Sequence, residues 1–129
     1  MIYLDNNATT RIHPDVVAAM LPFLNDDYGN PSSVHPMGQQ TRQAIEESRR
    51  QTADLLGCRP TELIFTSGGT EADNAAILGV LQARNDKKTV ITSAVEHSAV
   101  RETLQHVAKF GWRVIEIPVD SEGRLDLPA

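Results

Sequence analysis

Cysteine is almost absent from this sequence of 129 residues, which contains only Cys58. One cysteine cannot form an internal disulfide, and it excludes the zinc sites that need several cysteines. It also fits a reducing compartment, so we expect a cytoplasmic protein. Long apolar runs are absent as well, and there is no apolar core of a signal peptide. The sequence therefore predicts neither a membrane span nor secretion.

Basic residues are in the minority. The chain has 12 Lys and Arg against 17 Asp and Glu, which gives a net charge of −5. No basic stripe interrupts this balance, so a nucleic-acid partner is not indicated. The remaining composition, with 40% hydrophobic and 22% charged residues, is that of a globular protein with a core of its own.

The first half of the sequence predicts two helices joined by a loop. Pro14 suits the first turn of a helix, and Pro22 is expected to kink or end that helix. Residues 25–36 are rich in Asn, Asp, Gly, Pro and Ser and predict a loop. A longer helix is expected over 37–56, with Gly57 as its C-cap. Its apolar contacts are expected at Ile45, Thr52, Leu55 and Leu56.

The second half alternates strands and helices. Short apolar runs predict strands over 62–66, 89–93 and 112–119. Helices are expected over 70–84 and 98–109, the second capped by Ser98, with a core stripe of Val100, Leu104 and Val107. Strands separated by helices indicate an α/β protein with a parallel sheet. We expect strand 62–66 to pair with strand 89–93 through a right-handed crossover.

Ser67-Gly68-Gly69-Thr70 is the strongest local signal for a ligand. It joins a predicted strand to a helix whose first N–H groups and positive pole favour an anion, so it predicts a phosphate site. The alternative is a tight turn closed by a capping box, since Thr70 and Asp73 have that spacing. Glu71 and Asp73 also place negative charge near the same pole. The loop is neither a Walker loop nor the dinucleotide fingerprint.

Other polar residues are less specific. His97 follows the predicted strand 89–93, and ligands bind beyond the carboxyl ends of strands in α/β sheets. It can act as an acid–base group or stack on a ring. The alternative is a histidine that bonds only to the backbone. His13, His35 and His106 lack metal-ligand spacing, so no metal site is predicted. The polar loops at 5–10 and 29–35 have a surface connection as their simplest interpretation.

Four motifs in this order resemble one family, the NifS/IscS-type cysteine desulfurases, which are pyridoxal-phosphate (PLP) enzymes of fold type I. The motifs are Tyr3-Leu4-Asp5-Asn6-Asn7-Ala8-Thr9-Thr10, Gly29-Asn30-Pro31-Ser32-Ser33-Val34-His35, Phe65-Thr66-Ser67-Gly68-Gly69-Thr70-Glu71-Ala72-Asp73-Asn74 and Thr92-Ser93-Ala94-Val95-Glu96-His97. The resemblance implies a partial large domain of the aspartate-aminotransferase type over 16–129, preceded by a segment over 1–15 that reaches the active site.

The resemblance also implies a reaction and a site. Such enzymes convert L-cysteine to alanine and pass the sulfur, as a persulfide, to an iron–sulfur scaffold or another acceptor. Gly69 and Thr70 would hold the PLP phosphate, and His97 would stack on the ring and shuttle protons. Asn7 and Ala8 would lie near the substrate. The cofactor would act as the electron sink while the protein orients it.

Several expected groups have no counterpart here. The family's Schiff-base lysine, persulfide cysteine, substrate arginine and ring-pairing aspartate lie downstream of the His97 motif, and Lys87, Lys88, Lys109 and Cys58 match none of them. The chain resembles the N-terminal third of such an enzyme, so we expect it to be inactive alone and stabilised by a complementary chain or as a homodimer. The alternatives are a non-catalytic fragment that only binds a partner, and a selenocysteine lyase or class V aminotransferase.

Overall fold

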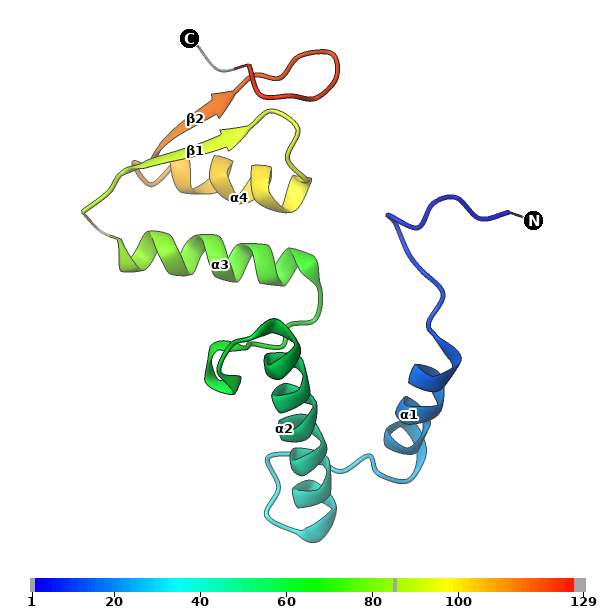
Figure 1. Ribbon diagram of the computed structural model, residues 1–129. Helices are drawn as coiled ribbons and strands as arrows, with labels where there is room; N and C mark the ends of the chain where they lie inside the picture. Colours follow the sequence, from blue (N-terminus) through cyan, green and yellow to red (C-terminus); the bar gives the residue numbers. More distant parts are fainter. Residues whose placement is uncertain (1, 85, 127–129) are drawn as a thin grey trace. The chain divides into compact units, whose positions relative to one another are not determined.

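The computed structural model describes residues 2–84 and 86–126. The chain divides between Ile64 and Phe65 into two compact units, and each is described by itself. The elements follow in the order α1 (Pro14–Asn25), α2 (Pro36–Leu56), the 3-10 helix η1 (Pro60–Glu62), α3 (Gly69–Ala83), β1 (Thr89–Ser93), α4 (Ser98–Ala108) and β2 (Arg113–Ile117) (Figure 1). Every helix in the described ranges is too short or too polar to cross a lipid bilayer.

The first unit contains the two predicted helices. Pro14 and Pro36 each open a helix, and Gly57 ends α2 in the left-handed conformation at φ 68°, as expected. Of the two effects expected of Pro22, a kink or an end, the end is wrong, because α1 continues to Asn25. A proline removes one helical hydrogen bond and leaves the following turn able to form. The carbonyl of Pro22 accepts hydrogen bonds from Asp26 and Asp27 at 3.0 and 2.9 Å.

The start of α2 packs closely on the preceding loop. Thr41 is buried, and its hydroxyl lies 2.7 Å from the carbonyl oxygen of Gly29. A Cβ atom on Gly38 would lie 2.5 Å from the carbonyl oxygen of Asn30, so this contact requires glycine. The expected apolar contacts of the helix are wrong in part: Leu55 is 85% exposed, and Ala53 is buried instead. α2 contacts η1 and buries its own small residues Gly38, Thr41 and Ala53, while Leu55 and Leu56 stay exposed.

The second unit contains a two-stranded parallel sheet. β1 and β2 pair from Thr89 with Arg113 to Ser93 with Ile117, in the parallel direction that the sequence predicts for the sheet. The expected pairing of strand 62–66 with strand 89–93 is wrong, because β1 pairs with β2. The predicted strand over 62–66 is wrong, since these residues form no strand. Leu63 has extended backbone, at φ −103° and ψ 127°, but a strand also needs a hydrogen-bonded neighbour, and the described sheet contains β1 and β2 alone.

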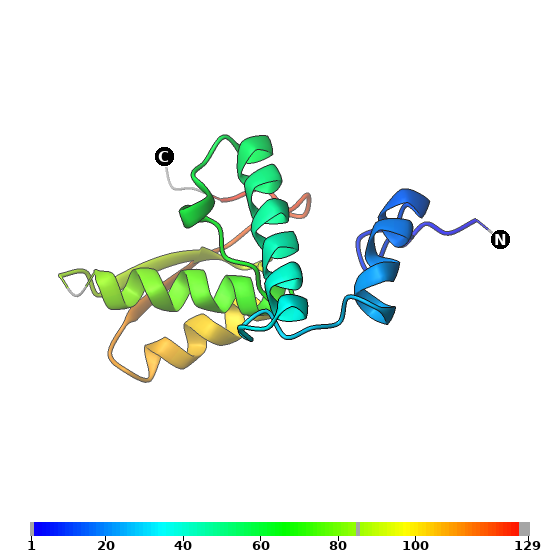
Figure 2. The ribbon, with the colours of Figure 1, turned by 90° about the horizontal axis from the view of Figure 1, so that it is seen from below.

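α3 and α4 lie side by side in the second unit (Figures 1 and 2). Their contact forms the core, where Leu81 from α3 meets Leu104 and Val107 from α4, as the predicted stripe indicates. Val90 and Val114, paired across the sheet, pack against this cluster. The fold is therefore α/β, with helices packed against the two parallel strands.

Candidate functional site

The N-terminus of α3 presents unpaired N–H groups beside an open glycine loop. The first intrahelical bond runs from Ala72 N–H to the carbonyl of Gly68, so the N–H groups of Gly69, Thr70 and Glu71 precede it. Gly68 is the N-cap residue and makes no side-chain cap. A Cβ on Gly68 or Gly69 would meet nothing within 4 Å among the described residues. Packing therefore does not require these glycines, whereas an approaching anion would use both the space and the donors.

The Glu71 carboxylate is hydrogen-bonded to Ser67, at the start of the glycine loop. Its Oε2 accepts hydrogen bonds from the Ser67 hydroxyl at 2.6 Å and from the Ser67 N–H at 2.7 Å. These two bonds, the hydroxyl first, lower the pKa of Glu71 below its ordinary value. The capping box considered for Thr70 and Asp73 does not form, because the helix already begins at Gly69. The Thr70 hydroxyl is therefore not used as a cap.

His97 occupies the N-cap position of α4, and the prediction that Ser98 caps this helix is wrong. The His97 Nδ1 atom accepts a hydrogen bond from the Ala99 N–H at 3.1 Å. An accepting Nδ1 carries no proton, so the neutral ring carries its proton on Nε2. His13 and His35 cap α1 and α2 in the same way. Histidine is not among the usual N-cap residues, which explains why the sequence pattern favoured serine.

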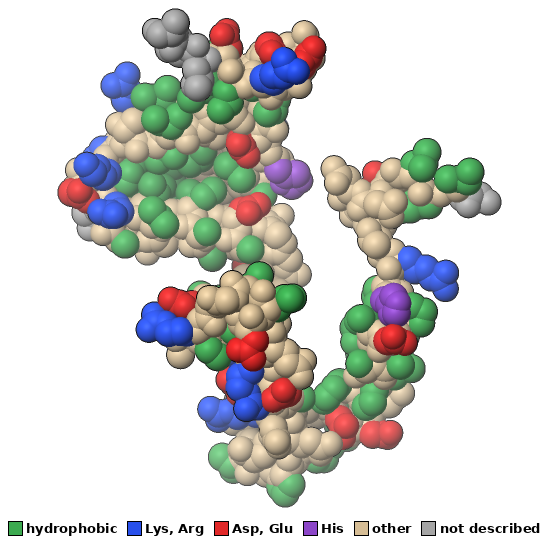
Figure 3. Space-filling view, viewed as in Figure 1, with side chains coloured by type: hydrophobic (Ala, Val, Ile, Leu, Met, Phe, Trp, Pro, Cys, Tyr) green, Lys and Arg blue, Asp and Glu red, His purple; other side chains and the backbone are tan. Residues whose placement is uncertain are grey.

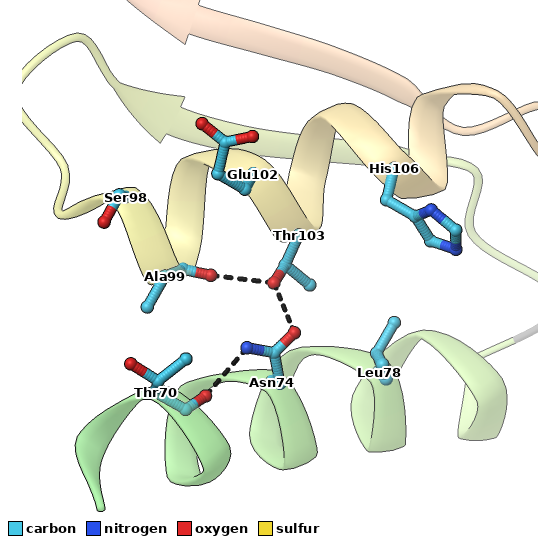
Figure 4. Close-up of a pocket in the computed structure, with 8 residues that line it drawn as sticks. All are labelled: Thr70, Asn74, Leu78, Ser98, Ala99, Glu102, Thr103 and His106. Atoms are coloured by element: carbon cyan, nitrogen blue, oxygen red, sulfur yellow. Dashed lines mark hydrogen bonds between the residues drawn. The ribbon is translucent and has the colours of Figure 1, made fainter.

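The two helix N-termini open on one groove. The first turns of both helices line one end of it, with Thr70 from α3 and Ser98 from α4 (Figure 4). The helices therefore run parallel, with their positive poles at the same end. The groove has a volume of about 330 Å³. α4 follows β1 after a short turn, so this end lies beyond the carboxyl end of the strand, where α/β proteins bind ligands. The structure thus brings Gly69, Thr70 and His97 to one end of one unit.

A polar link between the helices is a feature that the sequence interpretation missed. The Thr103 hydroxyl lies 2.5 Å from Asn74 Oδ1 and 2.7 Å from the carbonyl oxygen of Ala99. Asn74 Nδ2 donates to the carbonyl oxygen of Thr70 at 2.7 Å (Figure 4). A signal was available, since Thr103 falls on the apolar stripe of α4 and a buried hydroxyl needs a partner.

The other candidate residues belong to other segments of the chain. Asn7 and Ala8 form an exposed turn in the first unit, closed by a bond from Ala8 N–H to the Asp5 carbonyl, so their place near a substrate stays a prediction. Lys88 precedes β1 and stacks on Trp112, with 4.8 Å from Nζ to the ring centroid. It lies at the amino end of the strand, roughly 17 Å of strand length from the carboxyl end. Lys109 caps the far end of α4.

Metal ligands are not gathered in the described part of the chain. Within residues 2–84 and 86–126, no three His, Cys, Asp or Glu side chains lie close enough to hold a metal ion. The groups at the starts of α3 and α4 are instead backbone N–H groups, the Thr70 hydroxyl and the imidazole of the N-cap residue His97. This set suits a phosphorylated ring: the N–H groups and hydroxyl match a phosphate, and a histidine matches an aromatic face.

Comparison with known proteins decides the family. Residues 2–129 match the family described as aminotransferase class-V. The chain belongs to this family. Its members include PLP-dependent enzymes, so the family's cofactor is the kind of group that the groups at the starts of α3 and α4 fit.

The relatives agree with this assignment. Cysteine desulfurase 2 of Trichormus variabilis and cysteine desulfurase NifS of Azotobacter vinelandii are each 49% identical over 127 residues, or 98% of this chain and 32% of theirs. Among solved structures, a NifS-like protein matches with a TM-score of 0.88 and 40% identity, over 97% of this chain and 34% of that one. A structure of SspA in complex with cysteine matches with a TM-score of 0.82 and 34% identity, over 91% and 34%. The chain thus spans about a third of the length of its relatives.

Proposed function

We propose that this chain supplies the phosphate and ring contacts of a PLP-dependent cysteine desulfurase, which converts L-cysteine to alanine and transfers the sulfur as a persulfide. The observation that supports the proposal is the groove between α3 and α4, which Thr70 at the start of one helix and Ser98 at the start of the other both line. Relatives named cysteine desulfurases and a structural neighbour solved with cysteine support the choice of substrate.

Each residue has a role that follows from its geometry. The N–H groups of Gly69 and Thr70 and the Thr70 hydroxyl would bind the phosphate, aided by the helix dipole. His97 would lie against the cofactor ring; because its Nδ1 atom holds the Ala99 N–H, only Nε2 is left to give or take a proton. When bound, PLP supplies the electron sink for bond cleavage at the substrate α-carbon. Asn7 and Ala8 would contact the substrate end.

Partners follow from apolar surface that the described chain leaves uncovered. A groove of about 440 Å³ lies between α3 and β1, and Val80 and Ile91 beside it are 61% and 63% exposed. Hydrophobic side chains gather there in Figure 3. α1 has no buried residue, and Leu24 is 69% exposed. Apolar surface of this extent marks interaction sites, so we propose a complementary chain or a second copy as its cover.

The sulfur acceptor and the location are part of the same proposal. We assign an iron–sulfur scaffold or another sulfur acceptor as the downstream partner, on the names of the NifS and IscS relatives. The single, half-buried Cys58 fits the reducing cytoplasm. Cell fractionation tests the location, and transfer of labelled sulfur from L-cysteine to a purified scaffold tests the acceptor.

Alanine release from L-cysteine tests the function. The protein is purified from its own cells with the chains bound to it, and Thr70→Val is compared with Thr70→Ser, which keeps the hydroxyl. We expect alanine from the wild type, less from the valine variant and near-normal release from the serine variant. A complex that retains PLP and releases no alanine would contradict the desulfurase and favour a non-catalytic binding chain. The 129-residue chain alone is expected to release none.

A further inference from the structure

We propose, as an inference that rests on the proposed function, that Asn74 and Thr103 are positioning residues for the cofactor site. Their hydrogen bond holds the first turn of α3 against α4, so that the phosphate donors at Thr70 and the ring of His97 face the same ligand. Neither residue needs to touch the ligand. They act by fixing the groups that do.

The distances require a real hydrogen bond between the two side chains. Two oxygen atoms 2.5 Å apart, as Thr103 Oγ1 and Asn74 Oδ1 are, need a proton between them. The orientation of the Asn74 amide is fixed independently, because the Thr70 carbonyl can only accept and must therefore face Nδ2. Oδ1 then faces Thr103, whose hydroxyl is the donor. The Thr103 hydroxyl has one proton, and Asn74 Oδ1 and the Ala99 carbonyl oxygen both lie within hydrogen-bond distance of it, so the two acceptors share this donor.

Asn74 acts on the phosphate donors through a peptide plane. The Thr70 carbonyl and the Glu71 N–H belong to the same rigid plane and point in opposite directions. Holding the carbonyl at 2.7 Å from Asn74 Nδ2 therefore aims the Glu71 N–H at the open end of the helix. That N–H is one of those that precede the first intrahelical bond. Asn74 thus orients a donor of the proposed phosphate site from one turn away.

Thr103 connects the same network to His97. Ala99 gives its N–H to His97 Nδ1 at 3.1 Å, and its carbonyl oxygen lies 2.7 Å from the Thr103 hydroxyl. A continuous series of polar contacts therefore runs from His97 through Ala99, Thr103 and Asn74 to Thr70. The Thr103–Asn74 bond is a side-chain hydrogen bond that joins α3 to α4. It fixes the relative position of the two helix N-termini.

Packing alone does not call for a threonine at this position. Thr103 is 5% exposed and is next to Leu104 in the core stripe, where valine would fill the same volume without a polar group. A buried hydroxyl brings no apolar gain and requires a partner. The Ala99 carbonyl oxygen provides a partner within α4, and the contact with Asn74 is what the hydroxyl adds between the two helices.

Binding of two vitamin B6 forms to the full chain tests the inference. Pyridoxine phosphate carries the phosphate and pyridoxine does not, and neither has the aldehyde that would react with surface lysines. Isothermal titration measures both dissociation constants. We expect Thr103→Val to raise the dissociation constant of pyridoxine phosphate about threefold to tenfold, which is the effect of one neutral hydrogen bond. The dissociation constant of pyridoxine should stay unchanged. Thr103→Ser keeps the hydroxyl and is expected to bind both as the wild type does.

A second variant guards against misfolding of the valine variant. Asn74 is half-buried, so Asn74→Ala spares the core, and we expect the same selective loss of pyridoxine phosphate. The variant with both substitutions should lose no more affinity for pyridoxine phosphate than the weaker-binding single variant does, because both substitutions break the same bond. Lower stability with an unchanged ratio of the two constants would overturn the inference. A wild type that does not prefer the phosphorylated form would instead overturn the proposed phosphate site itself.

Discussion

His97 combines two roles that two substitutions can separate. As the N-cap of α4 it accepts the Ala99 N–H through Nδ1, and as a proposed cofactor residue it offers its ring. His97→Ala removes both roles. His97→Asn removes the ring and keeps a side-chain acceptor, since asparagine is among the best N-cap residues. A loss of stability seen in the alanine variant but not in the asparagine variant therefore measures the cap. A loss of ligand affinity seen in both variants measures the contribution of the ring.

The structure sets the size of each effect. Loss of an N-cap acceptor costs about 1 kcal/mol of stability, within a range of about 0.5–2. The bond from the Ala99 N–H to His97 Nδ1 is 3.1 Å long, within the ordinary range of N–H hydrogen bonds, so we expect the typical value of about 1 kcal/mol. Ring stacking contributes about 0.5–1.5 kcal/mol, which corresponds to about twofold to tenfold in affinity.

Two assays read the two roles. Urea unfolding followed by Trp112, the single tryptophan, reports on the second unit, because this ring packs against its core. We expect the alanine variant to lose about 1 kcal/mol and the asparagine variant a few tenths at most. Both should bind pyridoxine phosphate about twofold to tenfold more weakly. If the asparagine variant binds it as tightly as the wild type does, His97 is a cap alone and its place in the cofactor site is refuted.

Three further predictions follow from the glycines and from one carboxylate. Gly38→Ala should lower the free energy of unfolding by about 1–3 kcal/mol, because the added Cβ would lie 2.5 Å from the carbonyl oxygen of Asn30. Urea unfolding measures this change, and an unchanged midpoint would contradict the close contact. A Cβ on Gly69 would lie in open space, so Gly69→Ala should leave the midpoint of urea unfolding equal or higher. The same variant should bind pyridoxine phosphate more weakly, and unchanged binding in a titration would count against the loop as a phosphate site. The folded pKa of Glu71 is lowered by Ser67, so its contribution to stability is present above the ordinary pKa of 4.5 and is lost as the pH falls through the folded value. Unfolding from pH 3 to 7 should show this loss in the wild type and not in Glu71→Gln.

Local chemistry made most of the helices and both paired strands predictable. Proline fixes the backbone angle that a first helical turn needs, which placed the starts at Pro14 and Pro36, and a left-handed glycine placed the end at Gly57. The stripe that contains Leu104 predicted the face of α4 that packs on the core. The family resemblance, carried by four ordered motifs, pointed to the family that the comparisons establish.

Interactions between distant residues were not predictable in the same way. A short apolar run such as 62–66 forms a strand only with a neighbour, and pairing depends on the rest of the sheet. The expected contact of Leu55 failed because the buried residues of α2 are Gly38, Thr41 and Ala53, and no sequence pattern marked that face as the packed one. The bond between Asn74 and Thr103 joins residues 29 positions apart, so neither helix considered alone reveals it.

Native mass spectrometry of the protein purified from its own cells tests the central claim most directly. The account predicts a complex that holds this chain, a complementary chain or second copy, and an added mass equal to PLP. Thr70→Val should lose that added mass at lower activation energy than Thr70→Ser does, since only the serine keeps the phosphate donor. The chain alone, or its oligomer without the cofactor mass, would contradict the assignment of Gly69, Thr70 and His97 to a cofactor site.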